Sequence, residues 1–236
     1  MESILNVPPY FPEPLTVPQN VADAPYDARL RFIRLVIVGY VLSVGAVVAV
    51  ALSSIPGRPG PVAITGLAAT LLALSMIRIA TRLKPVEQVL SAVLTPALVY
   101  FGGLVARDAI AHGAPIWVIG AFAAYALLYV ALAGRDFSFL GLYLVAVGAT
   151  VVTAFGLAGR LGWPGAFVGW SVVAAVGFGF YFVYDFAMLL TRRRRYEVWA
   201  AVLDLYRDVL NILTYSIRVY RHWRRFPVWE WTRRPS

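Results

Sequence analysis

Five ionisable residues interrupt segments of the chain that are otherwise apolar: Arg78, Asp185, Asp204, Arg207 and Asp208. A charged side chain near the centre of a lipid bilayer costs about 2.5–3.5 kcal/mol on insertion scales. Such residues normally face the interior of a helix bundle, where they pair with one another or mark a path for ions or protons. We therefore take these five positions as the candidate functional residues.

Polar residues of the last apolar segment recur at the spacing of an α-helix. Asp204, Asp208, Asn211 and Tyr215 lie at i, i+4, i+7 and i+11, which places them on one helical face. Because so polar a face cannot contact lipid tails, we expect this helix to lie at the centre of the bundle. The alternative is an amphipathic helix on the membrane surface, with its aspartates in water.

Depth in the membrane leaves the partner of Asp185 open. At a rise of about 1.5 Å per residue, Asp185 lies about 9 Å from the inner end of its segment. Counted from Val198, Asp204 lies about 9 Å deep and Asp208 about 15 Å deep. Arg78 closes the second segment at the same end, and its long side chain can reach inward. Depth favours Asp204 as the partner of Asp185, whereas a tilted or late-starting helix would favour Asp208.

Other polar residues are weaker candidates. Glu87, Ser91 and Thr95 share one face of the third apolar segment, a pattern more typical of helix packing than of a pathway. The run of four arginines at 192–195 indicates orientation, with lipid head-group binding as a second interpretation. The chain has no cysteine, which excludes a disulfide scaffold and cysteine-ligated zinc or iron–sulfur centres.

The composition identifies the elements that must position these residues. Of the 236 residues, 60% are hydrophobic and only 14% are charged, whereas a soluble domain averages roughly 45–50% apolar and 25% charged residues. This composition predicts an all-α integral membrane protein and excludes an ordinary soluble globule or a disordered chain. The net charge of +9 comes from basic residues between apolar runs, which favours anionic lipid head groups over nucleic acid as the partner.

Seven segments are long and apolar enough, or helical enough in pattern, to be transmembrane helices. They are Leu35–Ile55, Val62–Ala80, Gln88–Ala106, Ile116–Gly134, Phe137–Gly159, Leu161–Leu190 and, approximately, Val198–Tyr220. These segments predict three regions. Residues 1–28 form a proline-bearing, extended cytoplasmic tail, residues 29–220 form the seven-helix transmembrane domain, and residues 221–236 form a basic, aromatic C-terminal tail.

The distribution of basic residues predicts the orientation. If the N-terminus is cytoplasmic, eleven lysines and arginines of the loops lie inside and three lie outside. We therefore expect a multi-pass protein of the cytoplasmic membrane with its N-terminus inside. Seven complete spans would place the six arginines from Arg218 onward outside, against this charge distribution. The sequence therefore does not decide on which side of the membrane the C-terminal tail lies. A re-entrant seventh helix, which would keep the tail inside, is the alternative to a seventh span.

Three motifs resemble those of the Bax inhibitor-1 (transmembrane BAX inhibitor motif) family. They are Arg135-Asp136-Phe137-Ser138-Phe139-Leu140 at the fifth helix, Tyr184-Asp185 near the end of the sixth, and LDLYRDVLNIL at 203–213. The last is similar to the family pattern Leu-Tyr-x-Asp, two hydrophobic residues, then Asn. The order, spacing and seven-helix layout are similar over roughly residues 30–220.

The resemblance implies a fold and a function. The fold is a bundle of seven transmembrane helices, six of them wrapped around a central polar seventh helix. The function is a pH-sensitive calcium leak channel of the prokaryotic type, in which Asp185 and Asp208 share a proton and Arg78, or alternatively Arg82, contacts the pair. Loss of the shared proton would free two helices and leave two carboxylates able to bind calcium transiently.

The expected pathway involves few further groups. The ion path would be lined, beside the aspartate pair, by Asp204, Asn211 and Tyr215. The transported ion would be calcium or another cation. Passive conduction needs no cofactor and is not an enzymatic reaction. We therefore expect the protein to bind no cofactor and not to be an enzyme. Any protein partner is unknown.

Two other functions are consistent with the sequence. A non-conducting regulatory protein could dock partners through the aromatic and basic stretch Trp223–Trp231. A small-solute or proton-coupled transporter is the other, although no convincing internal repeat is visible and Pro96 is the only proline deep inside a span. An intramembrane aspartyl protease is disfavoured, because the seventh segment has no Gly-x-Gly-Asp motif.

Overall fold

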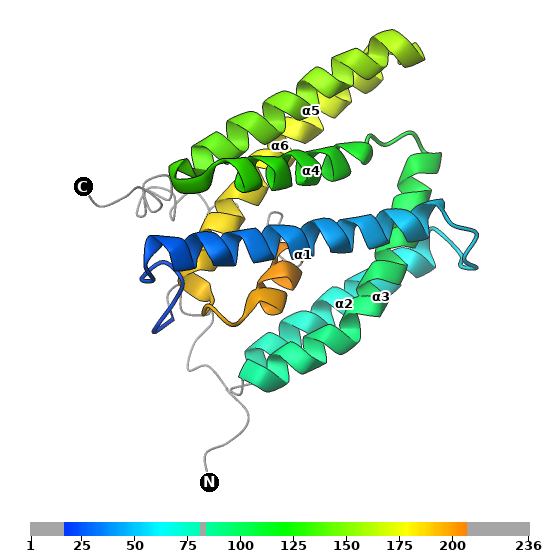
Figure 1. The fold of residues 1–236 in the computed structure, drawn as a ribbon. Helices are drawn as coiled ribbons and strands as arrows, with labels where there is room; N and C mark the ends of the chain where they lie inside the picture. Colours follow the sequence, from blue (N-terminus) through cyan, green and yellow to red (C-terminus); the bar gives the residue numbers. More distant parts are fainter. Residues whose placement is uncertain (1–16, 81–83, 207–236) are drawn as a thin grey trace.

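The computed structural model describes residues 17–80 and 84–206. Its elements are α1 (Tyr26–Leu52), α2 (Pro61–Ala80), α3 (Lys84–Ala111), α4 (Trp117–Leu132), the short 3-10 helix η1 (Gly134–Asp136), α5 (Phe139–Leu161) and α6 (Gly165–Arg192) (Figure 1). A further helix begins at residue 198 and continues to 206, where the described part ends. We call it the 198–206 helix. The described residues thus confirm an all-helical fold.

The long helices have the length and composition of membrane spans. Among the described residues, four helices meet both criteria, namely α1, α3 from Pro85, α5 and α6, and two shorter apolar helices cover Pro61–Ile77 and Trp117–Leu132. Large apolar side chains such as Leu42, Leu132 and Val152 are more than two-thirds exposed on the outer faces. Exposed apolar faces of this extent suit lipid rather than water, so the chain has the character of a multi-pass membrane protein.

Helix α1 starts at Tyr26, well before the expected Leu35; the other helix boundaries agree with the apolar runs to within a few residues. Two differences are informative. The boundary expected between residues 28 and 29 falls inside α1, which starts directly after Pro25 because no proline follows until Pro56. Leu161, expected to open the sixth span, instead ends α5, because Gly162 adopts a left-handed φ of 65° and caps that helix.

Helix α1 lies between two groups of helices. It packs on α3, which also packs on α2, and on its other side it packs on α4, which contacts α5 and α6 (Figure 1). Phe122, Phe182 and Phe186 form a chain of ring contacts in the core on the α4–α6 side.

The 198–206 helix is buried from its first turn. Val202 lies in the main core cluster, whereas Leu203 packs with Leu71 and Leu74 of α2 and with Leu98 of α3. A Cβ atom built on Gly39 of α1 would lie 2.8 Å from Val202 Cγ2, so glycine is what lets these two helices approach. This helix therefore contacts α1, α2 and α3.

Candidate functional site

A buried arginine lies where α6 ends. Arg193 has extended backbone angles and closes the helix, with its amide donating to the Leu189 carbonyl. Its guanidinium turns inward, where Nε lies 2.7 Å from Asp204 Oδ2, Nη2 lies 2.9 Å from Asp204 Oδ1 and Nη1 lies 2.7 Å from Glu87 Oε1. Both nitrogens on one edge of the fork thus bind Asp204, and the third binds Glu87. We call these three residues the charge cluster.

Three separate elements supply the charge cluster. Glu87 is in the first turn of α3, where a carboxylate is favoured by the helix dipole. Arg193 follows α6, and Asp204 lies in the second turn of the 198–206 helix. Each of the three residues is 2% exposed. The cluster therefore ties α3, the end of α6 and the 198–206 helix together through charges that are almost wholly buried.

The electrostatics of the cluster fix the charge of Arg193. Burial by itself would lower the pKa of Arg193, but the negative charges and hydrogen bonds of Asp204 and Glu87 hold that pKa above its ordinary value. The guanidinium is therefore a permanent cation. Removing one member of a buried, hydrogen-bonded set of charges leaves the others uncompensated, which typically costs about 3–5 kcal/mol.

A small cavity adjoins the charge cluster. Its volume is about 10 Å³, and it is lined by Leu74, Glu87, Ser91, Arg193, Ala200, Leu203 and Asp204. That volume is about the smallest that can hold one water molecule. The lining combines two carboxylates, a hydroxyl and a guanidinium, so the cavity suits water or a small cation better than an apolar ligand.

Asp185 belongs to a different pair. It lies two turns before the end of α6, is 4% exposed, and its Oδ1 is 3.9 Å from Nη1 of Arg192. Both carboxylate oxygens of Asp204 accept hydrogen bonds from Arg193 instead. The structure thus places the two aspartates beside two consecutive arginines.

The polar face expected on the third segment does connect helices. Ser91 is buried and lines the cavity, while Thr95 Oγ1 accepts a hydrogen bond from Trp199 Nε1 at 3.2 Å. Glu87 continues the same face into the charge cluster. This face of α3 therefore packs against the 198–206 helix, with contacts that extend from Trp199 to Asp204.

Several expected site residues lie outside what the structure describes. Arg78 is in the last turn of α2, but its side chain is not among the described ones, and Arg82, Asp208, Asn211 and Tyr215 fall wholly outside. The pairing of Asp185 with Asp208 and the calcium ligation by these two residues stay predictions. Among the described residues, no three His, Cys, Asp or Glu side chains gather as a metal site.

Sequence reasoning missed Arg193. The run 192–195 was interpreted as an orientation signal, which suits the exposed Arg195, but Arg193 is buried and paired. The sequence signal for this pair was Glu87. It is an acidic residue at the start of an apolar helix, and a buried carboxylate there needs a basic partner. Nothing in the run itself distinguishes Arg193 from its neighbours.

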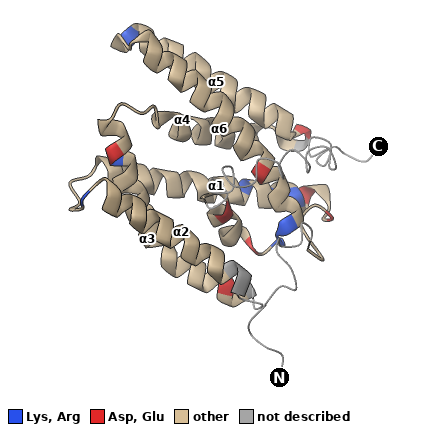
Figure 2. Ribbon diagram, turned by 180° about the vertical axis from the view of Figure 1, so that it is seen from behind, with Lys and Arg blue, Asp and Glu red and all other residues tan. Residues whose placement is uncertain are grey.

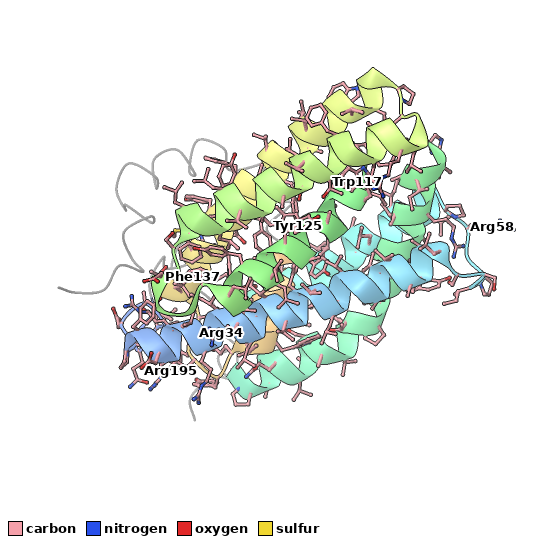
Figure 3. All side chains as sticks on the ribbon, turned by 45° about the horizontal axis from the view of Figure 1, so that its top comes forward. Arg34, Arg58, Trp117, Tyr125, Phe137 and Arg195 are labelled. Atoms are coloured by element: carbon pink, nitrogen blue, oxygen red, sulfur yellow. The ribbon has the colours of Figure 1, made fainter. Side chains whose placement is uncertain are left out.

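Charged residues gather at the ends of the bundle and leave the helix middles apolar (Figure 2). Arg34, Phe137 and Arg195 mark one end and Arg58 marks the other (Figure 3). The charge cluster and Asp185 lie toward the end of Arg195, where α6 finishes. Buried carboxylates and arginines are thus concentrated at that end of the spans.

No protein-family model, no curated protein and no solved structure matches this chain.

Proposed function

We propose that the chain is a pH-sensitive leak channel for calcium or another cation, of the Bax inhibitor-1 type, with the N-terminus in the cytoplasm. In this proposal six helices surround a central seventh that continues from the 198–206 helix. The single observation that carries it is the buried set of acidic residues at one end of the spans, Asp185, Glu87 and Asp204, each next to or bonded to an arginine.

The chemistry of these residues suits a gated cation path. Carboxylate and hydroxyl oxygens are the ligands that calcium prefers, and Glu87, Ser91 and Asp204 present them around a cavity of about 10 Å³. A cavity so small cannot pass a hydrated ion, so in this proposal it must widen for conduction. Opening requires the salt bridges of Arg193 to break or shift.

Protonation supplies a reason for pH sensitivity. Asp185 is buried beside Arg192, and we propose that it shares a proton with Asp208 from the continuing seventh helix. Two neighbouring buried carboxylates cannot both ionise without repulsion, so the proton joins the two helices until the pH rises. Arg78, at the end of α2, would stabilise the ionised form of the pair.

Flux into liposomes tests the proposal. Purified protein is reconstituted with a calcium dye inside the vesicles, and dye signal is followed between pH 5 and 8. We expect flux above that of empty vesicles, with a pH dependence that Asp185→Asn removes. Asp108→Asn is the matched control, because Asp108 lies at the opposite end of α3 beside His112. Flux equal to that of empty vesicles at every pH would overturn the proposal.

A further inference from the structure

Residues 17–24, which we call the strap, cross the end of α6 without forming a helix. Asn20 holds the strap in shape, because its Nδ2 donates to the Val17 carbonyl at 3.0 Å and to Asp23 Oδ2 at 2.9 Å, while its Oδ1 accepts from the Asp23 amide at 3.1 Å. Gln19 adopts a left-handed φ of 58° at the bend. The strap is therefore a preformed turn.

The strap binds carbonyls at the end of α6. Val17 N donates to Thr191 O at 3.0 Å, Ala22 N to Leu190 O at 2.9 Å and Val21 N to Arg193 O at 2.9 Å. The last carbonyls of a helix have no partner within the helix, so the strap supplies the C-terminal cap of α6 from a distant part of the chain.

One apolar side chain anchors the strap. Val21 is fully buried in the main core cluster, whereas Pro18 and Gln19 are exposed. Next to the anchor, Asn20 and Arg194 form an isolated antiparallel bridge, and Arg194 Nε donates to the Pro18 carbonyl at 3.3 Å. Val21, backbone hydrogen bonds and the Arg194 side chain thus hold the segment against the end of α6.

Arg193 connects the strap to the charge cluster. Its carbonyl oxygen accepts from Val21 N, and its guanidinium binds Asp204 and Glu87. The same residue therefore holds the strap with its carbonyl and closes the charge cluster with its side chain. Release of the strap would free the carbonyl of the residue that closes the cluster.

We propose that the strap is a detachable restraint on the charge cluster. Docked, it holds Arg193 between Asp204 and Glu87 and keeps the adjoining cavity closed. Released, it lets Arg193 withdraw and opens the cavity to water and small cations. The effect on conduction rests on the proposed function, but the effect on the cavity does not.

A thiol reporter tests the cavity without any flux measurement. The chain has no cysteine, so Ser91→Cys introduces one buried thiol in the cavity wall. We expect a water-soluble maleimide to label it about tenfold faster when Val21→Asp removes the apolar anchor, since burying a valine favours docking by at least that factor. Gln19→Asn is the matched control, because asparagine tolerates the left-handed backbone and the side chain is exposed.

A disulfide staple tests the opposite direction, with the reduced form of the same variant as its reference. Residues of an antiparallel bridge lie close enough for a disulfide, so Asn20→Cys with Arg194→Cys should crosslink on mild oxidation, seen as a mobility change reversed by reductant. Added to the Ser91→Cys reporter, the staple should slow labelling at residue 91, read by peptide mass mapping. In liposomes the oxidised staple should lower calcium flux below that of the reduced protein.

The outcomes separate the two proposals. Unchanged labelling of residue 91 both in Val21→Asp and in the stapled protein overturns the strap proposal, whatever the flux. Vesicles without flux but with strap-dependent labelling would overturn the channel and support the strap. Flux that the staple does not alter, together with unchanged labelling, would leave the channel in place without the strap.

Discussion

Arg193 and Asp204 face each other edge to edge, with two guanidinium nitrogens 2.7 and 2.9 Å from the two carboxylate oxygens, although both residues are 2% exposed. This bidentate geometry is the strongest form of a charged hydrogen bond in proteins. Because Glu87 occupies the remaining side of the guanidinium at 2.7 Å, Arg193 joins α3, the end of α6 and the 198–206 helix by charge as well as by packing.

The first prediction concerns the stability that Arg193 supplies. Arg193→Met should lower Tm in detergent by about 10 °C, since the two buried carboxylates then lose their cation at a cost of about 3–5 kcal/mol. The Tm of Arg193→Lys should lie between those of Arg193→Met and the unmodified protein. An ammonium keeps the positive charge but cannot bind both oxygens of Asp204 in the same geometry. Differential scanning fluorimetry measures Tm, and the exposed Arg195→Met is the control; an equal loss in both variants would contradict the prediction.

The second prediction removes all three charges together. Arg193→Met combined with Glu87→Gln and Asp204→Asn should recover most of the Tm lost in Arg193→Met alone. Neutral amides leave no unpaired charge in the interior, and replacing a whole buried set of charges is often close to neutral for stability. The same fluorimetry decides; a triple variant less stable than Arg193→Met would show that the carboxylates stabilise the fold in another way.

The third prediction addresses the opposite end of the bundle. Arg107 on α3 donates to four carbonyls at and beyond the end of α1, those of Val50, Ala51, Ser53 and Ile55. Arg107→Ala should lower the free energy of unfolding by about 1–3 kcal/mol, because these helix-end carbonyls lose a charged donor.

The control for that variant is Arg160→Ala, an exposed arginine at the end of α5. Chemical denaturation followed by tryptophan fluorescence gives both values. The pH dependence of flux should be the same in Arg107→Ala as in the unmodified protein, because Arg107 lies far from the charge cluster along α3. A changed pH response would mean that the two ends of the bundle are coupled.

Hydropathy predicts most of this fold, because spans are set by apolar length and by proline and glycine breaks. The break at Pro56–Pro61 and the start of the 198–206 helix at Val198 both follow from the sequence. The apolar pattern predicts a sixth span from Leu161, directly after Arg160, whereas α5 runs through Leu161 and α6 begins after Gly162 and Pro164. A left-handed glycine cap was the signal that would have moved the boundary.

The charge cluster was harder to predict than the spans. Polar spacing along α3 indicated that Glu87, Ser91 and Thr95 share a face, and the structure places this face against the 198–206 helix. The partner of Glu87 could not be predicted, since Arg193 is 106 residues away and sits in a run of four equivalent arginines. Arg193 is the one that the end of α6 places opposite Asp204 and Glu87.

The last prediction decides which aspartate carries the pH response of the proposed channel. Asp185→Asn and Asp208→Asn should each abolish the pH dependence of calcium flux, because an amide cannot release the proton that the pair shares. Asp204→Asn should keep a pH response, although a shifted one, since Asp204 is bound to Arg193 in the charge cluster. Arg78→Ala should move the response to higher pH, because loss of a nearby cation disfavours the ionised carboxylate. Flux against pH for the four variants is the measurement. If Asp204→Asn loses its pH dependence while Asp208→Asn retains it, Asp185 pairs with Asp204 in the conducting protein, and Arg193 must leave Asp204 before the channel can respond.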